Sequence, residues 1–249
     1  MFTEADGTVT EKKRRAALEY LSSNPLLYVG MADAVKRGSA AIFYAEKDGV
    51  LLHELPGNVY MLAVSDEKTG RMLVDECPPC EIFAAHQSFI KDYAARKFSP
   101  IEWMICYQAA NMDGHLFGEN RIGLDIRLMY PDKADFVMEN YGILPRDEIE
   151  LHLERGDIFG GYFGGVIAGF IGTHLEGSMG LLTVLPEFRR RGVGFALESF
   201  LSDRLVKSGR TPFLQVECDN ERSLALQKKL GFSISSEKMY WMFSDNRCS

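Results

Sequence analysis

The segment Arg189-Arg190-Arg191-Gly192-Val193-Gly194 has the residue types and spacing that most clearly suggest chemistry. It follows an apolar run that stops at Pro186, and residues 194–208 predict a long amphipathic helix. Such a turn presents free backbone N–H groups at the positive end of a helix dipole, and glycines let a ligand approach the backbone closely. The segment therefore predicts a site for an anion such as a pyrophosphate.

The segment has three other possible interpretations. The arginine run alone is also typical of a solvated helix face. A dinucleotide-binding turn needs a third glycine after Gly192 and Gly194 and a βαβ order around it, and neither is evident. A P-loop needs a Gly-Lys-Ser/Thr sequence, which the chain lacks.

The same segment resembles the acyl-CoA-binding motif of the GNAT superfamily of acyltransferases, Arg/Gln-x-x-Gly-x-Gly/Ala. Arg189, Gly192 and Gly194 match its fixed positions, and Val184-x-Pro186 matches its lead-in. This motif places the pyrophosphate of the co-substrate on the backbone at the start of the helix.

A second segment supports the resemblance. A predicted strand is followed by Asn220, then by a predicted helix that ends at Gly231-Phe232, which is the order found in the superfamily. The resemblance covers about residues 124–243, roughly half of the chain. It implies a GNAT fold in the C-terminal half.

The resemblance implies acetyl-CoA, or another acyl-CoA, as co-substrate, and no metal. The Val184 backbone would pair with the pantetheine arm like an added strand, and Asn220 would contact that arm from the other side of a cleft. The implied cofactor-binding residues are Leu182, Thr183, Val184, Arg189, Arg190, Arg191, Gly192, Val193, Gly194, Asn220, Ser223 and Gln227.

The catalytic groups are less clear because the chain departs from the family. Many members have a Tyr four residues before the Gly-Phe pair, but this chain has Gln227, which cannot give up a proton. A strand glutamate found in some members is also absent. Glu217, His174 and Tyr141 are the candidates for a base, an acid or an acceptor-pocket residue.

The sequence therefore predicts an N-acyltransferase, most simply an N-acetyltransferase, that moves the acyl group directly to a primary amine without a covalent enzyme intermediate. The amine belongs to a small molecule in the first instance, with a protein amine as a second class. The alternative is a non-catalytic acyl-CoA-binding sensor or regulatory module.

Composition is that of an ordinary globular protein. The chain has 249 residues, 46% of them hydrophobic, and a net charge of -7. The acidic balance argues against a general nucleic-acid binder. The predicted fold class is α+β with a mixed sheet, divided into an N-terminal mixed α/β domain over 1–120 and a GNAT domain over 121–249.

The first half predicts two helices, a hairpin and then alternating strands and helices. This order fits a degenerate copy of the same fold, and an unrelated α+β domain is the alternative. The glycine N-acyltransferase-like group has such a two-part layout. The predicted elements of the first half are helices over 10–22, 25–38 and 87–98, a hairpin centred on residues 47–49, and strands over 58–65, 81–86 and 101–111.

The cysteines and the N-terminus predict a cytoplasmic protein. No signal peptide or membrane span is apparent, and five cysteines, an odd number, are typical of reduced thiols. Cys77-Pro-Pro-Cys80 is interpreted as a turn between two elements, with a zinc site or a redox pair as the weaker alternatives.

Overall fold

The computed structural model describes residues 8–244, and it divides the chain into two compact units. The first unit contains the chain up to Ala110 together with Gln215–Lys228 and the segment from Phe232 onward. The second contains Asn111–Leu214 and Lys229–Gly231.

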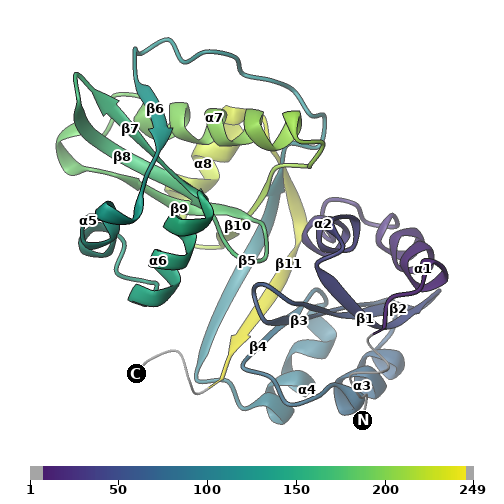
Figure 1. Ribbon diagram of the computed structural model, residues 1–249. Coiled ribbons are helices and arrows are strands. Elements are labelled where there is room, and N and C mark those ends of the chain that lie inside the picture. The colour runs from purple at the N-terminus through teal and green to yellow at the C-terminus, as the bar shows by residue number, and fades with distance from the viewer. Residues whose placement is uncertain (1–7, 245–249) are drawn as a thin grey trace. The chain divides into compact units, whose positions relative to one another are not determined.

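A sequence of nine elements occurs twice along the chain, in the order α α β β β α β α β (Figure 1). This repeat supports the interpretation of the first half as a degenerate copy of the second. The first copy consists of α1 (Glu11–Leu21), α2 (Val29–Arg37), β1 (Ala40–Glu46), β2 (Gly49–Glu54), β3 (Val59–Val64), α3 (Glu67–Glu76), β4 (Ile82–Ala85), α4 (Ser88–Phe98) and β5 (Glu102–Ala110).

One further strand, β6, precedes the second copy. The elements from there on are β6 (Asp125–Leu128), α5 (Ala134–Asn140), α6 (Arg146–Arg155), β7 (Ile158–Phe163), β8 (Val166–Thr173), β9 (Met179–Val184), α7 (Val193–Lys207), β10 (Phe213–Glu217), α8 (Glu221–Leu230) and β11 (Ser233–Phe243). Short 3-10 turns at Pro131–Lys133 and Pro186–Phe188 lead into α5 and toward α7.

Most helices and strands lie where the sequence predicts them. Thr10 caps α1, its side chain accepting a hydrogen bond from the Lys13 N–H, and Gly38 ends α2 in the left-handed region. The helix predicted to open at Pro25 instead begins at Val29. The Asn24 side chain accepts from the Leu27 N–H at 3.2 Å, which forms a local turn that competes with the helix there.

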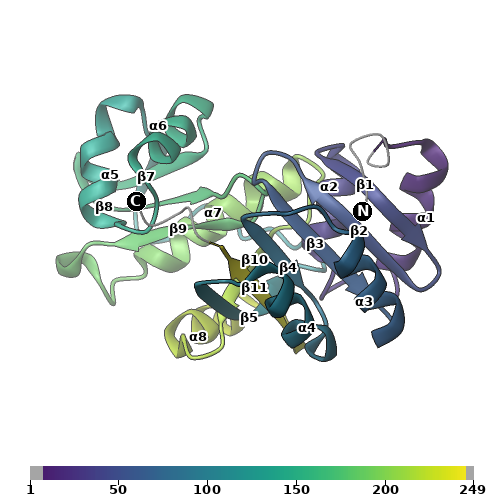
Figure 2. The same cartoon turned by 90° about the horizontal axis from the view of Figure 1, so that it is seen from below.

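A mixed sheet in the order β1-β2-β3-β4-β11-β5-β10 organises the first unit. One face packs on α1 and α2 around Leu21, Met31 and Ile42. The opposite face packs on α3 and α4 around Leu73 and Ile90 (Figure 2). Both faces are covered by helices, which explains the long apolar runs in these strands.

The division differs from the domains predicted over 1–120 and 121–249. Strand β11, near the C-terminus, pairs antiparallel with both β4 and β5, so it belongs to the first unit. The order of residues along the chain does not reveal such a return of the last strand to the first sheet.

The second unit is built on the antiparallel sheet β6-β7-β8-β9. Helices α5 and α6 pack on one face around Val137, Ile149 and Phe170. Helix α7 covers the other face, where Phe200 packs edge-on against Phe159 at 5.3 Å between ring centroids. This sheet ends at β9, the strand that leads into the arginine-glycine segment.

Candidate functional site

The arginine-glycine segment forms a tight turn between β9 and α7. Arg190 and Gly192 both lie in the left-handed region, with φ of 63° and 83°. The hydrogen-bond ladder of α7 opens where the Ala196 N–H donates to the Gly192 carbonyl at 3.0 Å. The N–H groups of residues 193–195 precede that bond and are the unsatisfied donors of a helix N-terminus. A turn that curls in this way is a concave backbone site for an anion.

Two of the three arginine side chains brace this turn. Arg189 Nε donates to the Val184 carbonyl at 3.2 Å. The Arg191 guanidinium lies 5.5 Å from the ring centroid of Phe188 and 5.9 Å from that of Phe163, and those two rings are stacked. All three arginines remain exposed, so they add positive charge to the surroundings of the helix N-terminus.

Strand β9 is the edge of its sheet and carries a bulge. Phe170 pairs with Thr183 and Gly172 with Gly180, so β9 has one residue more than β8 between these pairs. Leu181 sits in that bulge with φ of 53° although its side chain is buried. A non-glycine residue held in this conformation marks a strained point that the surrounding packing maintains.

The register between β8 and β9 decides which backbone groups of β9 face its open edge. An added Cβ on Gly169 would lie 2.2 Å from the Thr183 carbonyl oxygen, so that carbonyl faces β8. Because carbonyls alternate along a strand, the next carbonyl, that of Val184, faces the open edge. This is the edge on which the sequence predicts the pantetheine arm.

Tyr141, one of the predicted catalytic residues, lies against the bulge. It follows α5, and its ring packs against the core that contains the Leu181 side chain. Burial, and to a smaller extent the negative charge of Glu176, raises the pKa of Tyr141 to about 12. The hydroxyl therefore stays protonated at neutral pH, and its own proton remains available for donation.

His174 lies beside the same strand. It follows β8, and an added Cβ on Gly180 would lie 2.1 Å from His174 Nε2, so the ring packs against the backbone of β9. The connection between β8 and β9 is closed by the Gly177 N–H donating to the His174 carbonyl at 2.9 Å. The structure thus brings His174 and Tyr141 to neighbouring residues of one strand.

Glu176 joins this group, although it was not among the residues predicted for the site. The buried Ser178 hydroxyl donates to its carboxylate, and its charge acts on the Tyr141 hydroxyl. In the sequence Glu176 falls in a predicted hairpin turn, where a carboxylate is usually solvated. Only the fold of that turn directs it toward β9.

The remaining predicted residues belong to the first unit. Asn220 Oδ1 accepts from the Ser223 N–H at 3.0 Å and so caps α8, while Gln227 is fully buried. Gly231 ends this helix with φ of 76°, which explains the Gly-Phe pair. Glu217 is exposed at the end of β10. The roles assigned to these four side chains stay predictions.

The first copy has lost the features of an anion site at the equivalent helix. Helix α3 is capped by Asp66, whose carboxylate accepts from the Thr69 N–H and from the Thr69 hydroxyl, both at 2.9 Å. These hydrogen bonds lower the pKa of Asp66, so a negative charge already occupies the helix N-terminus. In addition β3 pairs in parallel with β4, which leaves no open edge on that strand.

The Cys77–Cys80 segment is a turn, as the sequence predicts. Cys77 is buried and ends α3, and Lys97 Nζ donates to its carbonyl at 2.6 Å. Within residues 8–244 no group of three His, Cys, Asp or Glu side chains is placed to hold a metal ion. Cys248 lies outside the described residues. None of the helices between residues 8 and 244 combines the length and apolar character needed to cross a membrane.

Comparisons with known proteins agree on the fold. The family model described as "FR47-like protein" matches residues 158–242. No curated protein matches the chain. Among solved structures, a Drosophila protein is 14% identical, with 96% of this chain and 98% of that chain covered and a TM-score of 0.69.

Two further structures carry descriptive titles. An acetyltransferase of the GNAT family from Colwellia psychrerythraea is 14% identical, covers 98% of each chain and has a TM-score of 0.54. A GCN5-related N-acetyltransferase-like protein from Streptococcus suis is 12% identical, with 91% of this chain and 99% of that chain covered and a TM-score of 0.53. The chain therefore has the fold of the GNAT superfamily, as the arginine-glycine motif predicts.

Proposed function

We propose that the protein is an N-acetyltransferase that uses acetyl-CoA, or a related acyl-CoA, to acylate a primary amine. The observation that carries this proposal is that three features follow one another directly along the chain. They are the bulged edge strand β9, the turn at residues 189–192 and the free N-terminus of α7. Together they offer a strand edge for an extended amide-bearing arm and a backbone concavity for a diphosphate.

The residues present fit this co-substrate. The N–H groups of residues 193–195 would hold the pyrophosphate, with Arg190 free to add charge. The open edge at Val184 would hydrogen-bond the two amides of the pantetheine arm. Arg189 Nε already contacts the Val184 carbonyl, so we expect this side chain to shift when the arm binds.

The chemistry requires few groups from the protein. An acyl thioester is already activated: transfer forms the amine N–C bond, breaks the C–S bond, and moves one proton from the amine to the CoA sulfur. The protonated Tyr141 hydroxyl beside Leu181 is suited to donate a hydrogen bond to the developing negative charge. His174, beside Gly180, is suited to accept a proton from the amine.

The acceptor is proposed as a primary amine on a small molecule, with a protein amine as the second class. The direct test incubates the purified chain with acetyl-CoA and a panel of amines, amino acids and peptides while free CoA thiol is measured. Amine-dependent thiol release supports the proposal and names the acceptor class. Binding of acetyl-CoA without release from any acceptor would favour the sensor alternative, and absence of binding would refute both.

Replacement of Tyr141 by phenylalanine should lower kcat by about 10- to 100-fold while the KM for acetyl-CoA changes little. The hydroxyl is removed, but the half-buried ring that packs against the Leu181 core is kept. Steady-state kinetics on the best acceptor measure the effect.

The matched control is Tyr130→Phe, because Tyr130 is 63% exposed in the segment before α5. The control should retain full activity. An unchanged kcat in Tyr141→Phe would remove Tyr141 from the proposed chemistry, and an equal loss in both variants would point to a general structural effect.

A further inference from the structure

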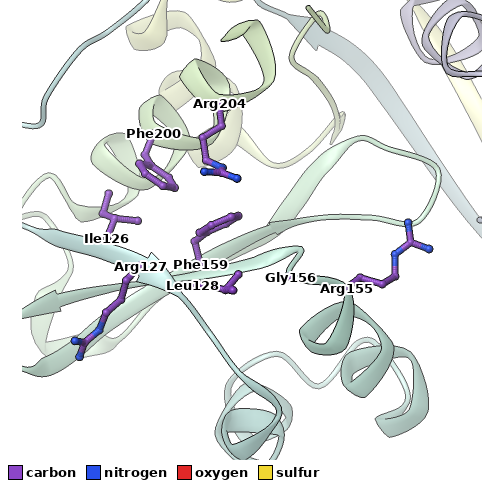
Figure 3. A pocket seen from close by; sticks show the side chains of 8 residues that line it. All are labelled: Ile126, Arg127, Leu128, Arg155, Gly156, Phe159, Phe200 and Arg204. Atoms are coloured by element: carbon purple, nitrogen blue, oxygen red, sulfur yellow. The ribbon is translucent and has the colours of Figure 1, made fainter. Parts of the chain in front are cut away.

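A hollow of about 560 Å³ lies beside strand β6, on the side of its sheet that faces α7 (Figure 3). Its lining combines apolar side chains with three arginines: Ile126, Leu128, Phe159, Phe200, Arg127, Arg155 and Arg204. A second hollow of about 450 Å³ shares Ile126 and Phe200 with it. Ile126 and Leu128 are half-buried, so part of their apolar surface is left for another strand to cover.

Strand β6 is also an edge strand with backbone groups turned outward. The Met129 N–H donates to the Ile158 carbonyl of β7 at 2.9 Å. Since backbone groups alternate along a strand, those of Ile126 and Leu128 face the opposite, open edge. Leu124, in the same phase, has its N–H and carbonyl bonded by the Asn120 side chain at 3.0 and 2.9 Å. The outward edge of Ile126 and Leu128 is a template for another strand.

Two side chains on the other face of β6 carry opposite charges, so this face is complementary in charge to the same face of a second, antiparallel β6 strand. Asp125 and Arg127 have side chains 65% and 57% exposed, and their nearest charged atoms are 3.9 Å apart. Figure 3 shows Arg127 directed away from Phe159, on the face opposite to Ile126. An antiparallel strand with an acidic residue opposite Arg127 and a basic residue opposite Asp125 would satisfy both charges.

We propose that β6 pairs with β6 of a second copy of this chain, antiparallel about a two-fold axis at Ile126. In that register the two Ile126 residues exchange both backbone hydrogen bonds. Asp125 then lies directly opposite Arg127 of the other copy, twice by symmetry. The neighbouring register, centred on Arg127, would also align the outward backbone groups of Ile126 and Leu128, but it would place the two Arg127 side chains opposite each other.

The same pairing accounts for the hollows. Directly opposite residues of an antiparallel pair point to the same face, so Ile126 and Leu128 of the second copy reach the α7 side and cover the apolar walls. The two sheets would join into one, with a copy of α7 on the same face of each half.

This dimer should be weak, because β6 has only four residues. Sedimentation velocity of the full chain from about 1 to about 200 µM should show a reversible monomer–dimer equilibrium. A chain that stays monomeric over the whole range, or that forms larger open assemblies, would overturn the proposal.

Charge reversal tests the register. Asp125→Arg and Arg127→Asp should each raise the dimer Kd by about tenfold or more, because each homodimer then places like charges opposite each other. An equimolar mixture of the two variants should form a heterodimer, since one strand carries two positive and the other two negative side chains. Dimerisation of the mixture also proves that both variants fold.

The matched control is Arg15→Asp, which reverses an exposed arginine in α1 and should leave the wild-type Kd unchanged. Single variants that dimerise as well as the wild type would contradict the proposal. So would a mixture that remains monomeric when each variant alone is monomeric, because the assigned pairing requires that the mixture be rescued.

Discussion

Replacing Gly192 by aspartate should weaken acetyl-CoA binding by about 100-fold, because a carboxylate would stand at the helix N-terminus where the pyrophosphate is proposed to bind. Gly192 is exposed at the start of α7 and has φ of 83°. Aspartate tolerates this left-handed conformation better than most residues. Isothermal titration calorimetry with acetyl-CoA gives the change in Kd.

Gly192→Asn isolates the charge. Asparagine has nearly the shape of aspartate, tolerates the same conformation and caps a helix equally well. An added Cβ would meet Ile122 at 3.5 Å, an ordinary contact, in both variants. We expect the asparagine variant to bind within about fivefold of the wild type. Equal losses in the two variants would mean that the side chain, and not its charge, blocks the site, and equal retention would refute the proposed pyrophosphate position.

The turn at residues 189–192 and the start of α7 could be predicted from the sequence because both depend on the backbone. Glycines in the left-handed region and a helix N-terminus leave a local signal, since few other residue types are tolerated there. Gly192 and Gly231 both have positive φ in the structure. Apolar periodicity is also a local signal, so most helices and strands could be located from the sequence, apart from the start of α2.

The candidate catalytic side chains are harder to predict because they come together from separate connections. Tyr141 follows α5 and Glu176 lies between β8 and β9, yet the charge of Glu176 acts on the Tyr141 hydroxyl. Nothing in the local sequence marks Leu181, because an apolar residue in an apolar strand predicts ordinary extended backbone. The bulge follows from the register between β8 and β9, which depends on contacts across the sheet.

The assignment of the last strand illustrates the same limit at the level of the fold. The residues of β11 predict a strand from their own composition, and the structure agrees over Ser233–Phe243. Its neighbours are β4 and β5, from the first half of the chain. Pairing of this kind is decided by the whole core, so a division of the sequence at residue 120 could not anticipate it.

Replacing Gly169 by alanine should lower the free energy of unfolding by about 3 kcal/mol, because the added Cβ meets backbone that cannot rotate away. It would lie 2.2 Å from the Thr183 carbonyl oxygen and 3.1 Å from Val184 Cα. Strand β9 must move away from β8 to relieve this overlap, and the pairing of Gly169 with Val184 is then lost. Urea unfolding followed by circular dichroism measures the change.

Gly142→Ala is the matched control, because an added Cβ there meets nothing within 4 Å and its φ is not positive. It should be neutral or slightly stabilising, since alanine restricts the unfolded chain more than glycine does. Equal stability of the two variants would show that β8 and β9 are not as close as described. A strongly destabilised Gly169→Ala would instead establish that the missing side chain is what lets β9 present Val184 at the open edge of the sheet, the position the acyl-CoA proposal requires.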